Sequence, residues 1–249
     1  MIQGLYSSAA GALAESSRHA VISNNLANVS TPGFKADLAL FRARDPESVE
    51  GPFPAYATPM DTIAGGVFTA ETRTRHGQGP VKVTDSPFDL AIDGRGYFAV
   101  TDGTDTYYTR AGAFTRDSLG RLAMPNGRYY LADASGRELR VPPHATVQVT
   151  RDGTVNVDGS PIAKIVLFDF DDESLLSKAG SNLYDGAGAS AFPALGRVKQ
   201  GALETSAVSP VAEMANMIMA SRSYEANMQM IKMQDQTLAD LVTVGTVNV

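Results

Sequence analysis

The longest uninterrupted segment of the chain lies near its C-terminus and predicts a helix too long for a small domain to cover. From Pro210 to about Val242 the sequence contains no Gly and no further Pro. Pro is favoured in the first turn of a helix, so the helix is expected to begin there. At about 1.5 Å per residue it is roughly 50 Å long. We expect it to pack against another helix, either the N-terminal one or helices of other subunits.

The apolar positions of this C-terminal segment recur at alternating spacings of three and four, the period of a coiled-coil seam. Six of the nine Met residues lie between Met214 and Met233. Because the unbranched Met side chain adapts to irregular surfaces, it can fill gaps between helices or form a versatile binding face. For the stripe as a whole we favour packing between subunits. Its members are Met214, Met217, Ser221, Tyr224, Met228, Ile231, Asp235, Leu238 and Val242.

A second helix is predicted at the N-terminus, from Ile2 to about Asn28. Its seam follows the same period but consists mainly of small residues, which suits the close approach of another helix. The segment Thr31-Pro32-Gly33 then ends the helix, because Pro fixes φ and Gly tolerates a positive φ, as a type II turn requires. The seam residues are Ile2, Leu5, Ala9, Ala12, Ser16, His19, Ser23 and Leu26.

The middle of the chain favours extended structure. Residues 35–79 contain several Pro residues and a Gly pair, which indicates an extended, loop-rich connector. Short β-prone runs then alternate with turn dipeptides such as Asp102-Gly103 and Asp158-Gly159, as in an antiparallel β domain. Ala163–Phe170 is expected to close it as one longer strand. The predicted fold class is α+β, with long N- and C-terminal helices pairing as a coiled-coil layer and an antiparallel β-rich domain that is central in the sequence.

Four segments follow from these patterns. They are the N-terminal helix and turn (1–34), the connector (35–79), the β-rich outer domain (80–195), and a return segment with the C-terminal helix (196–249). The chain has 249 residues, 43% of them hydrophobic, which is enough for a core. No apolar run approaches the roughly 20 residues that a membrane helix needs. No basic residue precedes Arg18, so we expect no cleavable secretory signal.

Composition also narrows the function. The net charge of −6 argues against a nucleic-acid or anionic-membrane partner, since such proteins carry a basic excess. The absence of Cys excludes disulfides, thiolate metal sites and Cys nucleophiles. The three His residues share no ligand spacing, and the acidic run at 169–173 lacks the Gly of a calcium loop. We therefore predict no catalytic residue, metal, cofactor or small-molecule substrate.

One N-terminal segment carries a family resemblance. Residues 22–35 read Ile-Ser-Asn-Asn-Leu-Ala-Asn-Val-Ser-Thr-Pro-Gly-Phe-Lys, which closely resembles the N-terminal signature of bacterial flagellar basal-body rod and hook proteins. Residues 94–98 with 108–114, and 201–208 with 217–225, look like the central and C-terminal segments of the same family. The residues that match the N-terminal signature are Asn24, Asn25, Leu26, Ala27, Asn28, Thr31, Pro32, Gly33 and Phe34.

The resemblance implies a structural subunit of the flagellar rod that polymerises through its terminal helices and transmits torque from motor to hook. It is most similar to the proximal-rod member, with the distal-rod member as the alternative. Implied partners are other copies of the chain, neighbouring rod subunits and the flagellar type III export apparatus. The implied location is the basal body in the periplasm, reached without a cleavable signal peptide.

The assembly residues expected on this basis are the nine N-terminal matches and six stripe residues. Two other functions stay open from the residues alone. A soluble module that docks partner helices would use the same Met stripe, and an enzyme acting on wall glycan would need a carboxylate pair that the sequence does not single out. The six stripe residues are Met214, Met217, Tyr224, Met228, Ile231 and Leu238.

Overall fold

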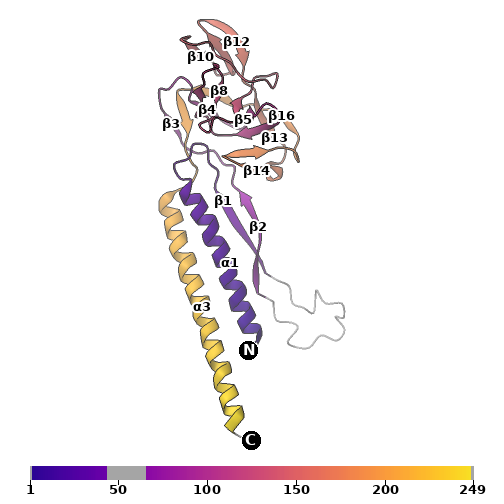
Figure 1. Cartoon of the computed structure of the whole chain (residues 1–249), viewed down its shortest axis with the longest axis vertical. Helices are drawn as coiled ribbons and strands as arrows, with labels where there is room; N and C mark the ends of the chain where they lie inside the picture. The colour runs from indigo at the N-terminus through magenta and orange to yellow at the C-terminus, as the bar shows by residue number, and fades with distance from the viewer. Residues whose placement is uncertain (1, 44–65, 248–249) are drawn as a thin grey trace. The chain divides into compact units, whose positions relative to one another are not determined.

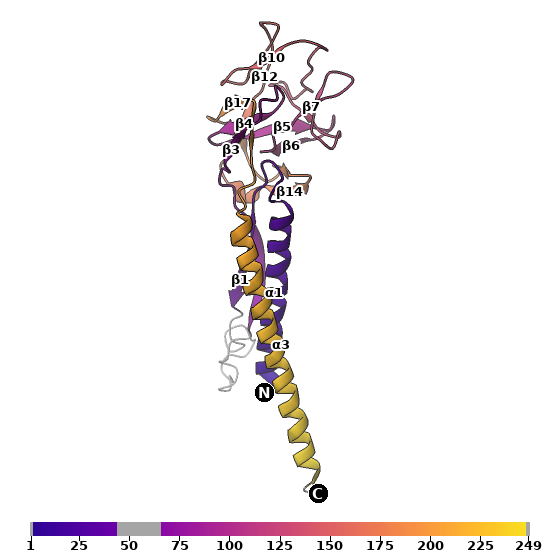
Figure 2. The same cartoon turned by 90° about the vertical axis from the view of Figure 1, so that its left-hand side faces the viewer.

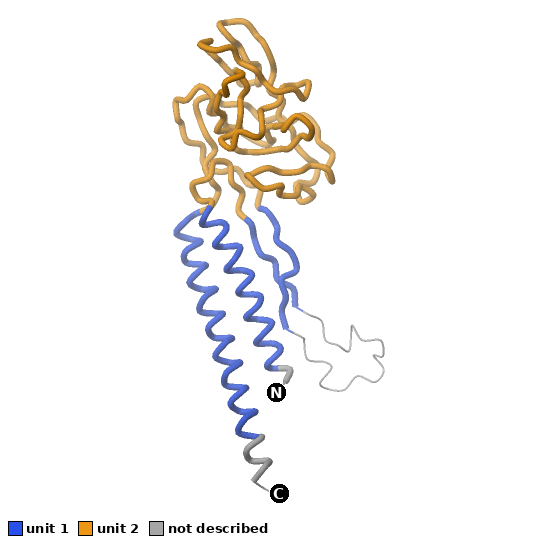
Figure 3. The backbone as a smooth tube through the Cα atoms, in the orientation of Figure 1, with its two compact units in different colours: residues 1–27, 37–74, 209–249 blue, residues 28–36, 75–208 orange. Residues whose placement is uncertain are grey.

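The computed structural model describes residues 2–43 and 66–247, which form two compact units. The helical unit consists of residues 1–27, 37–74 and 209–249, and the β unit consists of residues 28–36 and 75–208 (Figure 3). The chain therefore crosses between the units four times, after residues 27, 36, 74 and 208.

Two long helices and a strand pair build the helical unit. Helices α1 (Ile2–Ala27) and α3 (Pro210–Val247) run antiparallel side by side in both views (Figures 1 and 2). Their starts and ends confirm the two predicted helices, including the start of the second at Pro210. Strands β1 (Asp37–Ala43) and β2 (Val67–Thr74) pair antiparallel with a bulge at Leu40/Phe41 and pack on α1.

The strands β1 and β2 occupy the two ends of the segment predicted as a connector. Their pairing joins residues such as Asp37 and Thr74, which are far apart in sequence, so no hairpin dipeptide between them signals it. Residues 44–65, the centre of that segment, lie outside the described residues. The division into four segments stays a prediction.

The β unit is an antiparallel β structure, as predicted. Its largest sheet follows the order β14-β15-β6-β5-β9-β8-β7, with β13 pairing β5 and β16. Smaller sheets are β10-β11-β12, β17-β4 and β18-β3. The strands are β3 (Val81–Val83), β4 (Leu90–Asp93), β5 (Tyr97–Thr101), β6 (Thr106–Thr109), β7 (Thr115–Arg116), β8 (Leu122–Ala123), β9 (Tyr130–Leu131), β10 (Val147–Val149), β11 (Thr154–Val157), β12 (Ser160–Lys164), β13 (Leu167–Phe170), β14 (Ser177–Gly180), β15 (Leu183–Asp185), β16 (Ala191–Pro193), β17 (Arg197–Gln200) and β18 (Ala202–Glu204), with a short 3₁₀ helix η2 (Glu173–Leu175).

The single strand predicted over Ala163–Phe170 is wrong. The chain leaves the β10-β11-β12 sheet at Lys164 and joins the large sheet at Leu167. Between them Ile165 is buried, and its amide donates to the carbonyl of Gly153 at 2.8 Å. Residues of both strands and of the link between them pack in the same hydrophobic core, so the sequence from 163 to 170 is apolar throughout its centre. Hydrophobicity alone therefore does not show where one strand ends and the next begins.

The β unit has one main hydrophobic core and a smaller aromatic cluster. The core includes Phe98, Leu131 and Ile165, each at most 2% exposed. The aromatic cluster joins Tyr97, Phe170 and Tyr184, whose rings meet edge to face. Among the described residues no helix is both long enough and apolar enough to span a bilayer.

Candidate functional site

The contact between α1 and α3 depends on glycines that face large polar side chains. A Cβ atom added to Gly11 would lie 3.0–3.2 Å from the side chain of Asn227, and one added to Gly4 would lie 3.1 Å from Nε2 of Gln234. Gly4 and Gly11 are seven residues apart, and so are Asn227 and Gln234. These two contacts of the antiparallel pair thus recur after seven residues, each with a glycine of α1 opposite a long side chain of α3.

The side of α3 that faces α1 carries most of the predicted stripe. Ala220 is fully buried on this side, and at 100° per residue the half-buried Met217, Met228, Ile231 and Leu238 fall on the same side. The two remaining stripe residues, Met214 and Tyr224, are 47% and 40% exposed. Four of the six predicted residues thus pack within the subunit.

Large apolar residues of α3 outside this covered set are exposed, on a surface that they share with Arg222, Glu225 and Lys232. We call this surface the free face of α3. Each of its large residues leaves between 46% and 72% of its area accessible to solvent. On α1, Tyr6 and Leu13 are similarly exposed, at 69% and 71%. The free face consists of Val211, Met214, Ile218, Met219, Met230, Met233 and Leu241.

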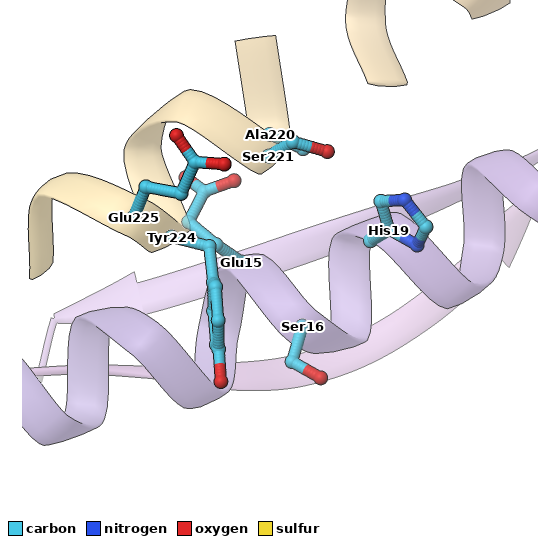
Figure 4. Close-up of a pocket in the computed structure, with 7 residues that line it drawn as sticks. All are labelled: Glu15, Ser16, His19, Ala220, Ser221, Tyr224 and Glu225. Atoms are coloured by element: carbon cyan, nitrogen blue, oxygen red, sulfur yellow. The ribbon is translucent and has the colours of Figure 1, made fainter. Parts of the chain in front are cut away.

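A groove of about 370 Å³ lies between the two helices (Figure 4). Glu15 and His19 of α1 and Tyr224 and Glu225 of α3 are among its lining residues. Figure 4 shows that Glu15 and His19 come from α1, and Tyr224 and Glu225 from α3. Within the part of the chain that the structure describes, no three His, Asp or Glu side chains gather as metal ligands.

The Asn residues of the N-terminal signature act largely inside the chain. The buried Asn25 donates from Nδ2 to the carbonyl of Asp37 at 2.8 Å and accepts from the amide of Asp37 at 2.9 Å. This pair of hydrogen bonds ties the end of α1 to the start of β1. Asn28 accepts a hydrogen bond from Thr31 Oγ1 at 3.2 Å. Asn24 and Ala27 are exposed, and Leu26 is half-buried.

The turn that follows α1 packs within the β unit. Gly33 has a φ of +67° and the amide of Phe34 donates to the carbonyl of Thr31, which confirms the predicted type II turn. Phe34 is buried, and Lys178 Nζ lies 4.7 Å from the centre of its ring. Asn182 Nδ2 donates to the carbonyl of Pro32 at 2.8 Å. Gly33 and Phe34 are thus inaccessible in the single chain.

Comparison with known proteins assigns the family. Three family models match: the flagella basal body rod protein at residues 5–35, the flagellar hook protein FlgE/F/G D1 domain at residues 91–157, and the flagellar basal body rod FlgEFG protein C-terminal region at residues 199–244. The flagellar basal-body rod protein FlgG of Bacillus subtilis is 33% identical over 97% of this chain and 98% of its own length. The chain belongs to the flagellar basal-body rod protein family.

Other relatives of this rod protein carry two names. FlgG of Caulobacter vibrioides is 33% identical over 95% of the chain and 97% of the relative. FlgF of the same organism is 34% identical over 87% of the chain and 86% of the relative. The rod protein is a structural subunit of the flagellar basal body, and its family is not an enzyme family.

Sequence reasoning missed much of the free face of this rod protein. It selected one apolar stripe by its heptad spacing, but α3 also carries large apolar residues outside this stripe, and they are exposed. Of the free face, only Met214 was among the predicted residues. The available signal was the set of apolar residues outside the stripe, such as Ile218, Met219 and Met233, which an ordinary surface helix would not carry.

Proposed function

We propose that this rod subunit polymerises through its terminal helices, with α1 and α3 pairing in each subunit and the free face of α3 packing on neighbouring subunits as a coiled-coil layer. The observation that carries this proposal is the row of exposed apolar residues from Val211 to Leu241 on a helix whose other side is already covered. Single exposed apolar residues are ordinary on monomeric proteins, whereas seven large ones gathered on one helix indicate an interaction surface.

The size of the free face suits assembly into an array. Fully burying one Met, Ile or Leu side chain stabilises by about 1.5–3 kcal/mol, so burying the remaining half of seven such residues gives roughly 5–10 kcal/mol. Bringing two proteins together costs about 4–15 kcal/mol. One pairwise contact is therefore marginal, and a subunit held by several neighbours in a polymer is stable.

We propose a different role for the residues of the N-terminal signature, between Asn24 and Phe34. Asn25, Gly33 and Phe34, which are buried within the chain, set where the chain leaves α1. Of the other matched residues, the exposed Asn24 and Ala27 are the ones placed to meet a neighbouring subunit directly.

The test is a single charge on the free face. Ile218→Asp places a carboxylate at a position that is 56% exposed, so the isolated subunit should keep the circular dichroism and melting temperature of the wild type. It should nevertheless be absent from purified basal bodies, and the cells should not swim. The matched control is Ile162→Asp in the β unit, where Ile162 is 45% exposed. Normal incorporation and swimming with Ile218→Asp would contradict the proposal.

Finer features of the function are also proposed. We place the subunit in the proximal rod, on the resemblance of its sequence motifs, with the distal rod as the alternative. The rod would transmit torque from motor to hook. The subunit would be exported by the flagellar type III apparatus to the periplasm without a cleavable signal peptide. Labelling the tagged subunit in rods stalled at successive stages of assembly tests its place in the rod.

A further inference from the structure

We propose that the buried carboxylate of Glu204 is a clamp that holds together the three segments of the β unit through which the chain passes to and from the helical unit. Its Oε1 atom accepts hydrogen bonds from Lys35 Nζ at 2.5 Å and from the amide of Gly79 at 2.8 Å. Its Oε2 atom lies 3.4 Å from Nη1 of Arg110. Its backbone carbonyl accepts from the amide of Gly33 at 2.8 Å.

The residues that Glu204 binds lie close to the points where the chain crosses between the two units. Gly33 and Lys35 belong to the short segment 28–36, which has a crossing at each end. Gly79 closely follows the crossing after residue 74, and Glu204 closely precedes the crossing after residue 208. The segments that meet at this one carboxylate therefore adjoin all four crossings.

Each charged group of the clamp lies in a different one of the three segments that match the rod-family models. Lys35 ends the N-terminal signature, Arg110 lies in the central segment, and Glu204 lies in the segment that leads to α3. In sequence Lys35 and Glu204 are 169 residues apart. The three motifs, although distant in sequence, thus contribute to one buried ion-pair cluster. The polymer contacts proposed for α3 do not account for these three charged residues.

The clamp is deeply buried, which determines what it contributes. The exposed fractions of the Lys35, Glu204 and Arg110 side chains are 0%, 1% and 3%. Lys35 also donates to the carbonyl of Gly77 at 2.7 Å, and Arg110 donates to the carbonyl of Gly94 at 3.0 Å. Because desolvation offsets most of the Coulomb attraction in such a site, a buried ion pair adds little net stability. A buried charge must nevertheless keep its hydrogen-bond partners, so the ion pair fixes the relative positions of the segments that carry Lys35, Gly79, Arg110 and Glu204.

The first test uses the wild-type full-length chain and measures amide hydrogen exchange by NMR at increasing urea. If the clamp holds the segments as one group, the amides of Gly33 and Gly79 should open together in one step. This step should come before the opening of a core amide such as Val100. Independent opening of Gly33 and Gly79 would overturn the proposal, and this result does not depend on how any variant folds.

The second test removes the charge and keeps the shape. Glu204→Gln retains an oxygen acceptor but weakens the bonds to Lys35 and Gly79, so the amides of Gly33 and Gly79 should exchange at least about tenfold faster while Val100 changes little. The matched control, Glu71→Gln, weakens an ion pair with Arg73 in which both side chains are more than half exposed. It should leave all three amides unchanged.

Two results of the second test would overturn the clamp. One is an unchanged exchange rate at Gly33 and Gly79. The other is an equal acceleration at Val100, which would reveal only a general loss of stability. Both measurements use the isolated subunit, so their outcome is independent of whether the free face of α3 mediates polymerisation.

Discussion

Replacing Gly33 with Ala should destabilise the β unit more than the same change at a glycine of equal backbone conformation. Gly33 has a φ of +67°, and a side chain in this left-handed region costs about 1–2 kcal/mol. In addition, the new Cβ would lie 2.4 Å from the backbone carbon of Arg110 and 2.5 Å from its oxygen. Overpacking of this kind adds about 1–3 kcal/mol. The expected loss is therefore about 2–5 kcal/mol.

Gly127 provides the matched control for this substitution. Its φ is +68°, and a Cβ added there meets no atom within 4 Å. Gly127→Ala should consequently lose only the conformational part, about 1–2 kcal/mol. The difference between the two variants isolates the contact of the turn with Arg110.

Urea unfolding of the full-length chain measures both losses. The near-ultraviolet circular dichroism of the buried tyrosines, such as Tyr97 and Tyr184, reports on the β unit. Equal losses for Gly33→Ala and Gly127→Ala would refute the reasoning, because they would mean that the turn withdraws from Arg110 without cost.

Two further predictions concern the helix seam and the pH dependence of stability. Gly11→Leu should separate α1 from α3, because Asn227 already fills the space next to Gly11, and it should destabilise the helical unit by about 1–3 kcal/mol. Thermal unfolding followed by far-ultraviolet circular dichroism measures this loss. The control is Ala20→Leu at an exposed position of α1, which should leave the unfolding temperature unchanged. Burial lowers the pKa of His76 below its usual value of 6.5, so the unfolded chain binds the proton more readily and stability should fall as the pH drops below about 6.5. In His76→Asn this fall should be smaller between pH 7 and pH 5, and an identical pH profile of the urea midpoint would show that His76 does not contribute.

Local patterns in the sequence were sufficient for the features that depend on neighbouring residues. The stretch without Gly or internal Pro predicts α3, and Pro32-Gly33 predicts a turn whose glycine has a positive φ. These signals work because helix propensity and turn geometry are set within a few residues. The same local patterns carry the resemblance to the rod family, which the comparisons confirm.

The tertiary structure alone decides which surfaces are covered and which charges meet. Heptad spacing marks a stripe on α3, but only the packing of α1 shows that this stripe is largely covered within the subunit and that other apolar residues of α3 stay exposed. Likewise, the apolar sequence from Ala163 to Phe170 does not show that the chain changes from one sheet to another there. The ion pair between Lys35 and Glu204 forms only in the folded chain. The physical reason is the same in each case. Burial and ion pairing depend on residues far apart in sequence, and a local pattern specifies that a side chain needs a partner without specifying which one.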